Sequence, residues 1–440
     1  MRRAWGRGNT SLIECAASKE RRKRPLNERR KRPLDLKPRP MYEERVVSGM
    51  RPTGMLHLGH FHGALKNWVR LQSEHPCYFF VADWHALTTH YDTPELIEQS
   101  VWEMVIDWLA SGIDPSQATL FIQSRVPEHA ELHTLLSMIT PLGWLERVPS
   151  YKDQQEKLSD RDIATYGFLG YPLLQSADVL IYRAKYVPVG EDQVPHVEFM
   201  RELARRFNHI YGKEAGFEDK ATAAAKKMGS RKAKLYDQLR TRYQEQGDAD
   251  ALQSAKALLE EQQNLTAGDR DRLFGYLEGG GRLILVEPDV LLTDASRLPG
   301  LDGQKMSKSY GNTIGLREDA DSVRKKIRTM PTDPARVKRT DAGDPDRCPV
   351  WQFHLVYSDD KTREWANQGC RTAGIGCLEC KQPVIDRVIV EQGPMRERAQ
   401  RYLDDPTLVR NIVADGCEKA RALAQETMRE VREVMGLGYT

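Results

Sequence analysis

Several features that would identify a whole class of protein are missing from the sequence. No apolar run approaches the roughly 18 residues that a membrane-spanning helix needs, so we expect no membrane segment. The first 40 residues contain no apolar stretch of signal-peptide length, so we expect no secretory signal. The 440 residues are 40% hydrophobic and 29% charged, which is typical of a globular protein with several domains.

Cysteine is scarce as well. The chain has seven cysteines. An uneven number of cysteines in a long chain indicates a reducing compartment and argues against a disulfide framework. Four of them, Cys348, Cys370, Cys377 and Cys380, stand close together in the sequence. Four thiolates suit an iron–sulfur cluster or a tetrahedral zinc ion, and unligated thiols are the third alternative.

Positive charge is concentrated at one end. Residues 1–40 carry 14 Lys and Arg against 4 Asp and Glu, whereas the whole chain has a net charge of +3, so the remainder is mildly acidic. The density of like charge and the prolines predict a disordered basic tail over residues 1–40. This tail is either an arm that touches RNA or an extension without function, with Met41 as an alternative start.

From residue 45 onward, strand and helix patterns alternate. The segments 45–48, 77–82 and 119–122 are predicted strands, and a helix between Pro94 and Gly112 precedes the third. This alternation predicts an α/β fold, with a parallel sheet covered by helices on both faces.

The composition changes twice more along the chain. Residues 212–281 are rich in Ala, Lys, Glu, Gln and Arg and end at three glycines, which predicts a helical insertion. A strand pattern resumes at 282–286. After about residue 318 the hydrophobic periodicity predicts amphipathic helices to the end of the chain.

No Walker-type phosphate loop is present, so an ATP-using enzyme would need another phosphate site. The string Pro-Thr-Gly-Met-Leu-His-Leu-Gly-His, residues 52–60, lies between a strand and a helix start, where backbone N–H groups favour an anion. His57 and His60 add hydrogen-bond donors, and Gly59 allows a planar ring to approach the backbone. The alternative role for the two histidines is capping or turn formation.

A second string, Lys-Met-Ser-Lys-Ser at residues 305–309, stands between Gly303 and Gly311. These glycines predict a mobile loop whose lysines can reach a polyphosphate and follow the charge that develops on a leaving group. An ordinary solvated lysine loop is the alternative. The occurrence of both strings in one chain favours the phosphate site.

The two strings resemble the His-x-Gly-His and Lys-Met-Ser-Lys-Ser motifs of class I aminoacyl-tRNA synthetases. The segments 171–182 and 187–193, together with 112–115 and 123–124, resemble the tryptophanyl-tRNA synthetases in particular. The resemblance covers about residues 45–210 and 282–390. It implies a Rossmann-like parallel-sheet catalytic domain and an all-helical anticodon-binding domain. The implied boundaries are 41–211 and 282–318 for the catalytic domain, 212–281 for the helical insertion and 319–440 for the helical domain.

The resemblance also implies an activity. It implies Mg²⁺- and ATP-dependent activation of L-tryptophan to tryptophanyl-adenylate, transfer to the 3′ end of tRNA(Trp), a cytoplasmic location and a homodimer. Tyrosine–tRNA ligase is the close rival, and a non-catalytic, RNA-binding paralogue is a second alternative. A nucleotidyltransferase with a similar histidine motif would explain ATP use but not the helical C-terminal region.

Roles for individual residues follow from the same resemblance. The expected catalytic residues are His57, His60, Lys305 and Lys308. The expected ATP-binding residues are Arg51, Pro52, Thr53, Gly59, His60, Gly190, Glu191, Asp192, Leu298, Lys305, Met306, Ser307, Lys308 and Ser309. The expected tryptophan-binding residues are His85, Gln175, Asp178 and Gln193. Some members of the family carry a [4Fe-4S] cluster on four similarly spaced cysteines, so Cys348, Cys370, Cys377 and Cys380 are its expected ligands, although their first interval is one residue shorter.

Asp178 is the most informative residue for the substrate. It stands among apolar residues of a predicted helix, where an unpaired carboxylate would be costly to bury, so it needs a partner. The resemblance implies that this partner is the indole N–H of tryptophan. A structural salt bridge is the alternative.

Overall fold

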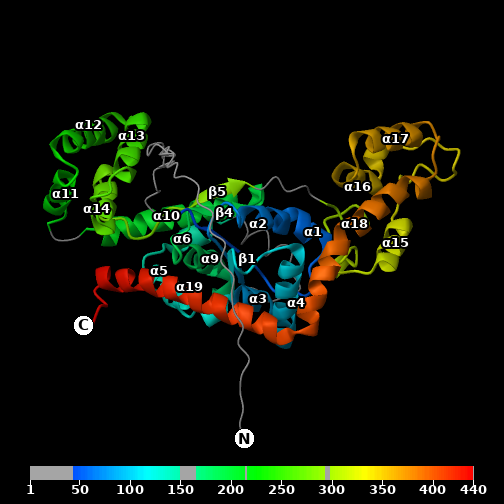
Figure 1. Ribbon diagram of the computed structural model, residues 1–440, viewed down its shortest axis with the longest axis horizontal. Coiled ribbons are helices and arrows are strands. Elements are labelled where there is room, and N and C mark those ends of the chain that lie inside the picture. Colours follow the sequence, from blue (N-terminus) through cyan, green and yellow to red (C-terminus); the bar gives the residue numbers. More distant parts are fainter. Residues whose placement is uncertain (1–42, 149–164, 214–215, 293–297, 440) are drawn as a thin grey trace, which may run out of the picture. The chain divides into compact units, whose positions relative to one another are not determined.

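The computed structural model describes residues 43–148, 165–213, 216–292 and 298–439, apart from the side chain of Ser309 (Figure 1). The basic tail predicted over residues 1–40 lies outside these residues. Within the described part, no helix combines the length and the apolar character that crossing a membrane requires.

Five parallel strands form the central sheet in the order β3–β2–β1–β4–β5. The strands are β1 (Val46–Met50), β2 (Cys77–Val81), β3 (Ala118–Ile122), β4 (Tyr186–Val189) and β5 (Asp289–Leu292). The strand order reverses at β1, between β2 and β4. Ligands of open α/β sheets bind at such a reversal, outside the carboxyl ends of the strands. The predicted α/β fold with a parallel sheet is confirmed.

Helices and turns surround the sheet and form the rest of the described chain. Those connected with the sheet are α1 (Leu58–His60), the π-helical turn η1 (Phe61–Leu65), α2 (Lys66–Leu71), α3 (Asp83–His90), α4 (Glu95–Ser111), α5 (Glu128–Ser137), α6 (Leu142–Leu145), α8 (Tyr166–Leu169), α9 (Tyr171–Leu180) and α10 (Val194–Tyr211). The core between sheet and helices is aromatic in part, since the Trp68 ring stacks on Phe79 at 4.3 Å and contacts Trp108 edge-on.

The predicted strand at 282–286 is wrong. This segment is irregular, because the side chain of Asn208 takes the place of a neighbouring strand. Its Oδ1 accepts hydrogen bonds from the backbone N–H groups of Ile284 (2.9 Å) and Leu285 (3.0 Å), and its Nδ2 donates to the carbonyl oxygen of Leu285 (2.7 Å). The strand that completes the sheet is β5, which begins three residues later.

Residues 217–277 form four helices with their own apolar core. They are α11 (Phe217–Lys226), α12 (Ser230–Gln246), α13 (Ala249–Glu260) and α14 (Ala267–Leu277). Tyr236, Leu259 and Leu273 are buried in this core, which is separate from the core around the sheet. At its base, the backbone N–H of Arg282 donates to the carbonyl oxygen of Gly212 (2.7 Å), so the two ends of the segment leave side by side.

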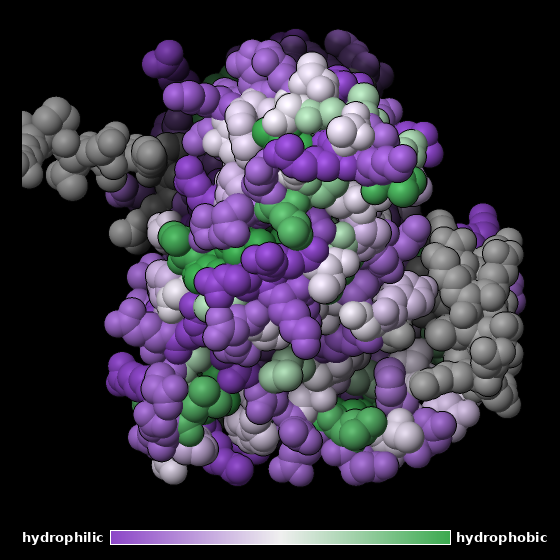
Figure 2. All heavy atoms as spheres, turned by 90° about the vertical axis from the view of Figure 1, so that its right-hand side faces the viewer, coloured by the Kyte–Doolittle hydropathy of each residue, from purple (hydrophilic) through white to green (hydrophobic). Residues whose placement is uncertain are grey.

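The remaining helices follow the lysine loop. They are α15 (Ala320–Thr329), α16 (Pro349–Tyr357), α17 (Asp360–Arg371), α18 (Cys377–Asp404) and α19 (Pro406–Val434). α15, α16 and α17 pack on α18, which also packs on α4, whereas α19 lies along β3 and α5. A Cβ on Gly416 of α19 would lie 1.9 Å from the carbonyl oxygen of Leu120, so glycine permits this close packing. Figure 2 shows the face toward the right-hand side of Figure 1, where hydrophilic side chains surround small, separate apolar groups.

Candidate active site

One cavity at the carboxyl ends of β1 and β4 contains many of the predicted site residues. Its volume is about 480 Å³, and it lies at the reversal of strand order. The predicted residues that line it are Arg51, His60, His85, Gln175, Asp178, Gly190, Gln193 and Lys305. The fold therefore brings together residues from the histidine string, the lysine string and the segments between them.

The histidine turn leads directly from β1 into a helical stretch. His57 is the N-cap of α1, and its backbone N–H donates to Nδ1 of His60 (3.3 Å). The two ring centroids lie 3.8 Å apart. Because Nδ1 of His60 accepts this bond, the single proton of the neutral ring is on Nε2, which is then the donor available to a ligand.

Both imidazoles are neutral at pH 7. Burial, and then the charge of Lys308, lowers the pKa of His57 to about 4. Burial, followed by the effects of His57, Lys308 and Lys305, lowers the pKa of His60 to about 3. The histidines can therefore contribute N–H donors, while the positive charge of the site comes from the loop lysines.

The lysine loop is held directly against the histidine turn. Nζ of Lys308 donates to the carbonyl oxygen of Thr53 (2.8 Å), and the backbone N–H of Gly59 donates to Sδ of Met306 (3.4 Å). A Cβ on Gly59 would lie 3.0 Å from Nδ1 of His57 and 3.3 Å from Cβ of Met306, so a larger residue would separate the two motifs.

The two loop lysines occupy different places. Lys305 lines the main cavity with His60, whereas Lys308 and His57 line a neighbouring cavity of about 410 Å³. Burial lowers the pKa of Lys308 to about 8, and the carboxylate of Asp107 opposes this effect. Lys308 is therefore mostly protonated at pH 7 and loses its charge as the pH rises through about 8.

Asp178 is completely buried on α9 and accepts three hydrogen bonds from side chains. Oδ2 accepts from Nε2 of His85 (2.7 Å), and Oδ1 accepts from Nε2 of Gln123 (2.7 Å) and Nδ1 of His129 (2.6 Å). Burial raises the pKa of Asp178, but His85 and His129 outweigh it and hold the pKa below the usual value. The chain itself therefore supplies partners for this buried carboxylate, so burial alone does not identify the substrate as its partner.

Two polar atoms near Asp178 have no hydrogen-bond partner among the described residues. They are Nδ1 of His85 and Oε1 of Gln175, and both are buried. With Nε2 of His85 donating to Asp178, Nδ1 is an acceptor in the neutral form of the ring, and the amide oxygen of Gln175 is an acceptor as well. This end of the cavity thus presents acceptors to a ligand that carries N–H groups.

The other predicted ATP-side residues differ in how they are placed. Glu191 and Asp192 are exposed in the short helix next to Gly190 and do not line the main cavity. Pro52 and Leu298 are buried away from it.

The rest of this predicted set lies in or against the lysine loop. Thr53 is exposed and contributes its carbonyl oxygen to Lys308. Met306 is buried, and the backbone N–H of Ser307 donates to Oδ1 of Asn312 (2.8 Å). The side chain of Ser309 lies outside the described part of the chain.

Sequence reasoning assigned no role to His129. It is fully buried at the start of α5 and bonds both Asp178 and the hydroxyl of Tyr182 (2.6 Å). It stands 49 positions before Asp178, and no spacing or motif connects the two residues. Gln123 carried part of the family resemblance, but nothing in the sequence indicated that its amide would hold the same carboxylate.

The four clustered cysteines lie near one another without meeting at one point. Burial, followed by the charges of the other three, raises the pKa of Cys380 to about 12. Across the described chain, no three or more His, Cys, Asp or Glu side chains are placed to hold one metal ion.

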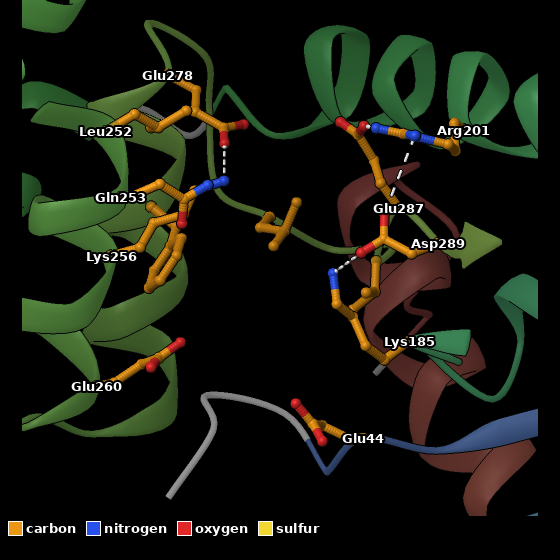
Figure 3. A pocket seen from close by; sticks show the side chains of 13 residues that line it. Glu44, Lys185, Arg201, Leu252, Gln253, Lys256, Glu260, Glu278, Glu287 and Asp289 are labelled. Carbon is orange, nitrogen blue, oxygen red and sulfur yellow. Dashed lines mark hydrogen bonds and ion pairs between the residues drawn. The ribbon is translucent and has the colours of Figure 1, made fainter. Parts of the chain in front are cut away.

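Another cavity, of about 440 Å³, separates the helices of residues 217–277 from the sheet and contains neither motif (Figure 3). Figure 3 shows side chains of α13 and Glu278, the residue after α14, on one side and residues near β4 and β5 on the other. The cations that line it are paired with carboxylates, as Lys185–Asp289, Lys256–Glu278 and Arg201–Glu287. We therefore assign this cavity to the packing of the inserted helices and not to the reaction.

Comparison with known proteins identifies similar sequences along most of the chain. The family model for tRNA synthetases class I (W and Y) matches residues 42–241 and 262–389. The tryptophan–tRNA ligase of Ralstonia nicotianae is 73% identical over 400 residues, which cover 91% of this chain and 100% of the relative. The tryptophan–tRNA ligase of Thermotoga maritima is 40% identical over 397 residues, which cover 90% of this chain and 100% of the relative.

Solved structures give the same result. The tryptophanyl-tRNA synthetase of Campylobacter jejuni, complexed with ADP and tryptophan, matches with a TM-score of 0.65 and 27% identity. The match covers 89% of this chain and 100% of that chain.

Proposed function

The chain belongs to the class I tRNA synthetases for tryptophan and tyrosine, and we propose that its cavity activates L-tryptophan with ATP for transfer to tRNA(Trp). It is an aminoacyl-tRNA ligase, and the two relatives named above are ligases for tryptophan, not tyrosine. Both motifs are complete in the sequence, which argues against a non-catalytic paralogue.

The reaction has two steps and needs no covalent enzyme intermediate. The carboxylate of tryptophan attacks the α-phosphorus of Mg-ATP, the bond to the β-phosphate oxygen breaks, and tryptophanyl-adenylate and pyrophosphate form. A hydroxyl of the terminal ribose of tRNA then attacks the adenylate carbonyl and displaces AMP. Such a reaction is accelerated by positioning and electrostatic stabilisation.

The two motifs would share the polyphosphate. Neutral His57 and His60 donate N–H groups to phosphate oxygens, and Lys305 and Lys308 stabilise the pyrophosphate as it leaves. Because that negative charge grows along the reaction, the lysines raise turnover more than they tighten ATP binding. Mg²⁺ arrives with the nucleotide, since it prefers phosphate oxygens and water to a cage of protein ligands.

Further residues would bind the nucleotide around these groups. Arg51 and Gly190 line the main cavity, which supports their assignment to ATP. Glu191 and Asp192 are assigned to the ribose, because their exposed carboxylates stand next to Gly190 at the end of β4.

The observation that carries the tryptophan assignment is the buried carboxylate of Asp178 beside acceptors that have no partner in the described part of the chain. Oδ2 of Asp178 accepts one bond from the chain and can accept another from the indole N–H. Gln175 and Gln193 line the same cavity, and we assign both to the binding of the tryptophan substrate. Phenylalanine has no indole N–H and would leave the acceptor position open for it without a donor, and sites that hydrogen-bond their substrate can discriminate by about 10⁴–10⁵ against an analogue that lacks the group.

Pyrophosphate exchange tests the proposal directly. The purified chain is incubated with ATP, Mg²⁺, labelled pyrophosphate and each of the twenty amino acids in turn. We expect exchange with tryptophan alone, followed by tryptophan-dependent charging of tRNA(Trp). Exchange with tyrosine would instead assign the chain to the rival activity, and exchange with no amino acid would remove the proposal.

For the four cysteines we propose a [4Fe-4S] cluster. The spacing of the four cysteines in the sequence and their mutual effect on the Cys380 thiol support this proposal. Protein purified without oxygen should contain iron and sulfide and show the visible absorbance of a cluster. Cys377→Ser should remove both, whereas Cys417→Ser, a change at a buried cysteine of α19, should not.

A homodimer in the cytoplasm completes the proposal. Large apolar side chains between residues 87 and 166 are exposed, which supports an interface there: Leu87, Tyr91, Leu96, Met138, Leu142 and Tyr166. Sedimentation should give twice the chain mass, and Met138→Ser with Leu142→Ser should reduce it. The helical domain over residues 319–440 would bind the anticodon, and the cytoplasm is where charged tRNA serves protein synthesis.

A further inference from the structure

The histidine turn and the segment after the lysine loop are joined by backbone hydrogen bonds. The backbone N–H of Leu58 donates to the carbonyl oxygen of Ile314 (2.9 Å), and that of Leu316 donates to the carbonyl oxygen of Leu56 (3.1 Å). Residues 56–58 and 314–316 thus form a short antiparallel bridge. This bridge fixes one end of the loop that carries both lysines.

A buried carboxylate from a third element holds both sides of this bridge. Asp107 on α4 is 1% exposed, and its Oδ2 accepts from the backbone N–H of Leu56 (2.7 Å). Its Oδ1 accepts from Nε of Arg317 (2.6 Å), whose Nη2 forms an ion pair with Glu103. One side chain therefore contacts the residue before His57 and the residue after the bridge.

We infer that Asp107 is a positioning residue for the activation step, because it sets the distance between the histidine turn and the lysine loop. The inference rests on the proposed function. Asp107 touches none of the residues assigned to tryptophan, so it acts on the phosphate side of the reaction. It lines the same cavity as His57 and Lys308, which are the groups it would align.

The role of Asp107 depends on its charge as well as on its acceptor oxygens. A buried charge is stable only when it is paired, and here Arg317 and a backbone N–H are the two partners. An amide at this position would keep one acceptor for Leu56 but would lose the charge that holds Arg317. The loop would then have more freedom relative to the turn, and small displacements of reacting groups can cost about 10²-fold in rate.

Asp107→Asn tests this in tryptophan-dependent pyrophosphate exchange. We expect kcat to fall by at least about tenfold while the KM for tryptophan changes less than about twofold. Arg317→Gln should give a similar loss, and the double variant should be no worse than either single one, because both remove the same link. Asp269→Asn, which changes a buried, ion-paired aspartate in the inserted helices, is the matched control and should keep wild-type kinetics.

Thermal unfolding of each variant separates positioning from folding. The inference is overturned if Asp107→Asn keeps the wild-type kcat. It is also overturned if kcat and the KM for tryptophan change together while the loss of stability is no different from that of Asp269→Asn. Additive losses in the double variant would overturn it as well. If the wild-type chain shows no exchange, the proposed function itself is wrong. This result differs from a failure of the role inferred for Asp107, which is tested by comparing the variants with an active wild-type chain.

Discussion

Lys308 and Thr53 are 255 positions apart in the sequence, and Nζ of the lysine donates to the carbonyl oxygen of the threonine at 2.8 Å. This bond brings the second lysine of the loop to the start of the histidine turn. An ammonium has three N–H donors, so one bond to the backbone leaves two for phosphate oxygens. The lysine therefore already lies next to the histidine turn, with two donors left for the polyphosphate that we propose it binds.

Removal of the Lys308 ammonium should lower turnover more than ATP affinity. For Lys308→Met we expect kcat in pyrophosphate exchange to fall by about 10²-fold, while the KM for ATP rises by less than about threefold. Lys325→Met, at an exposed lysine on α15, is the control and should change neither constant. A large rise in KM with an unchanged kcat would show that Lys308 binds the ground state instead.

The charge of Lys308 also predicts the pH dependence of the reaction. Its pKa is lowered to about 8, mainly by burial, so the ammonium is present below that pH and lost as the pH rises through it. Exchange should therefore decline above about pH 8. Lys308→Arg should remove this decline, because a guanidinium stays protonated. A decline that persists unchanged in the arginine variant would assign it to another group.

Asp178 should be needed for both tryptophan binding and stability. In Asp178→Asn an amide NH₂ would face donors from His85, Gln123 and His129, and loss of one member of a buried ionic network costs about 3–5 kcal/mol. We expect exchange to fall below detection and the unfolding temperature to drop. Calorimetry with ATP checks that the variant is folded, since its nucleotide side is intact. Normal tryptophan affinity would contradict the assignment.

The sheet and the two motifs could be predicted from the sequence because their signals are local. Apolar segments, capping residues and glycines mark β1 to β3 and α4 within a few positions of their observed ends. The histidine and lysine strings are contiguous, so their chemistry is visible without a fold. Their contact through Gly59 and Met306 requires only that both loops lie at the same edge of a parallel sheet.

The parts that could not be predicted depend on side chains from distant segments. Asp178 receives bonds from α3, from the turn after β3 and from α5, and none of these partners is marked by spacing. For the same reason Asn208 could not be foreseen as the group that replaces a strand at 282–286. In the sequence, Asp107 is one polar residue of a mostly buried helix. Its two partners, the backbone N–H of Leu56 and the side chain of Arg317, are known only from the structure.

The cavity in Figure 3 predicts a stabilising substitution. Burial, and then the charge of Glu44, raises the pKa of Glu260. A raised folded-state pKa means that this carboxyl favours the fold at low pH and that its contribution is lost as the pH rises and it ionises. Glu260→Gln should therefore raise the free energy of unfolding at pH 7 by up to about 0.5 kcal/mol, which would be measured as a slightly higher unfolding temperature. Glu261→Gln, at the exposed neighbour, should have no such effect, and equal effects would contradict the repulsion.

The base of the inserted helices contains a glycine that should not tolerate a larger residue. A Cβ on Gly281 would lie 2.1 Å from the carbonyl carbon of Gly212, whereas a Cβ on the adjacent Gly280 would meet nothing closer than 3.7 Å. Gly281→Ala should therefore force the two backbones apart and destabilise the chain by about 1–3 kcal/mol, as overpacking does, while Gly280→Ala should be nearly neutral. Thermal unfolding measures the difference, and limited proteolysis should show earlier cleavage near the base of the helices. Exchange in Gly281→Ala should stay within about threefold of wild type, because the cavity lies at the other end of α10, about 27 Å along an 18-residue helix. Equal stability of the two alanine variants would show that the backbones at residues 212 and 281 can move apart without a loss of stability.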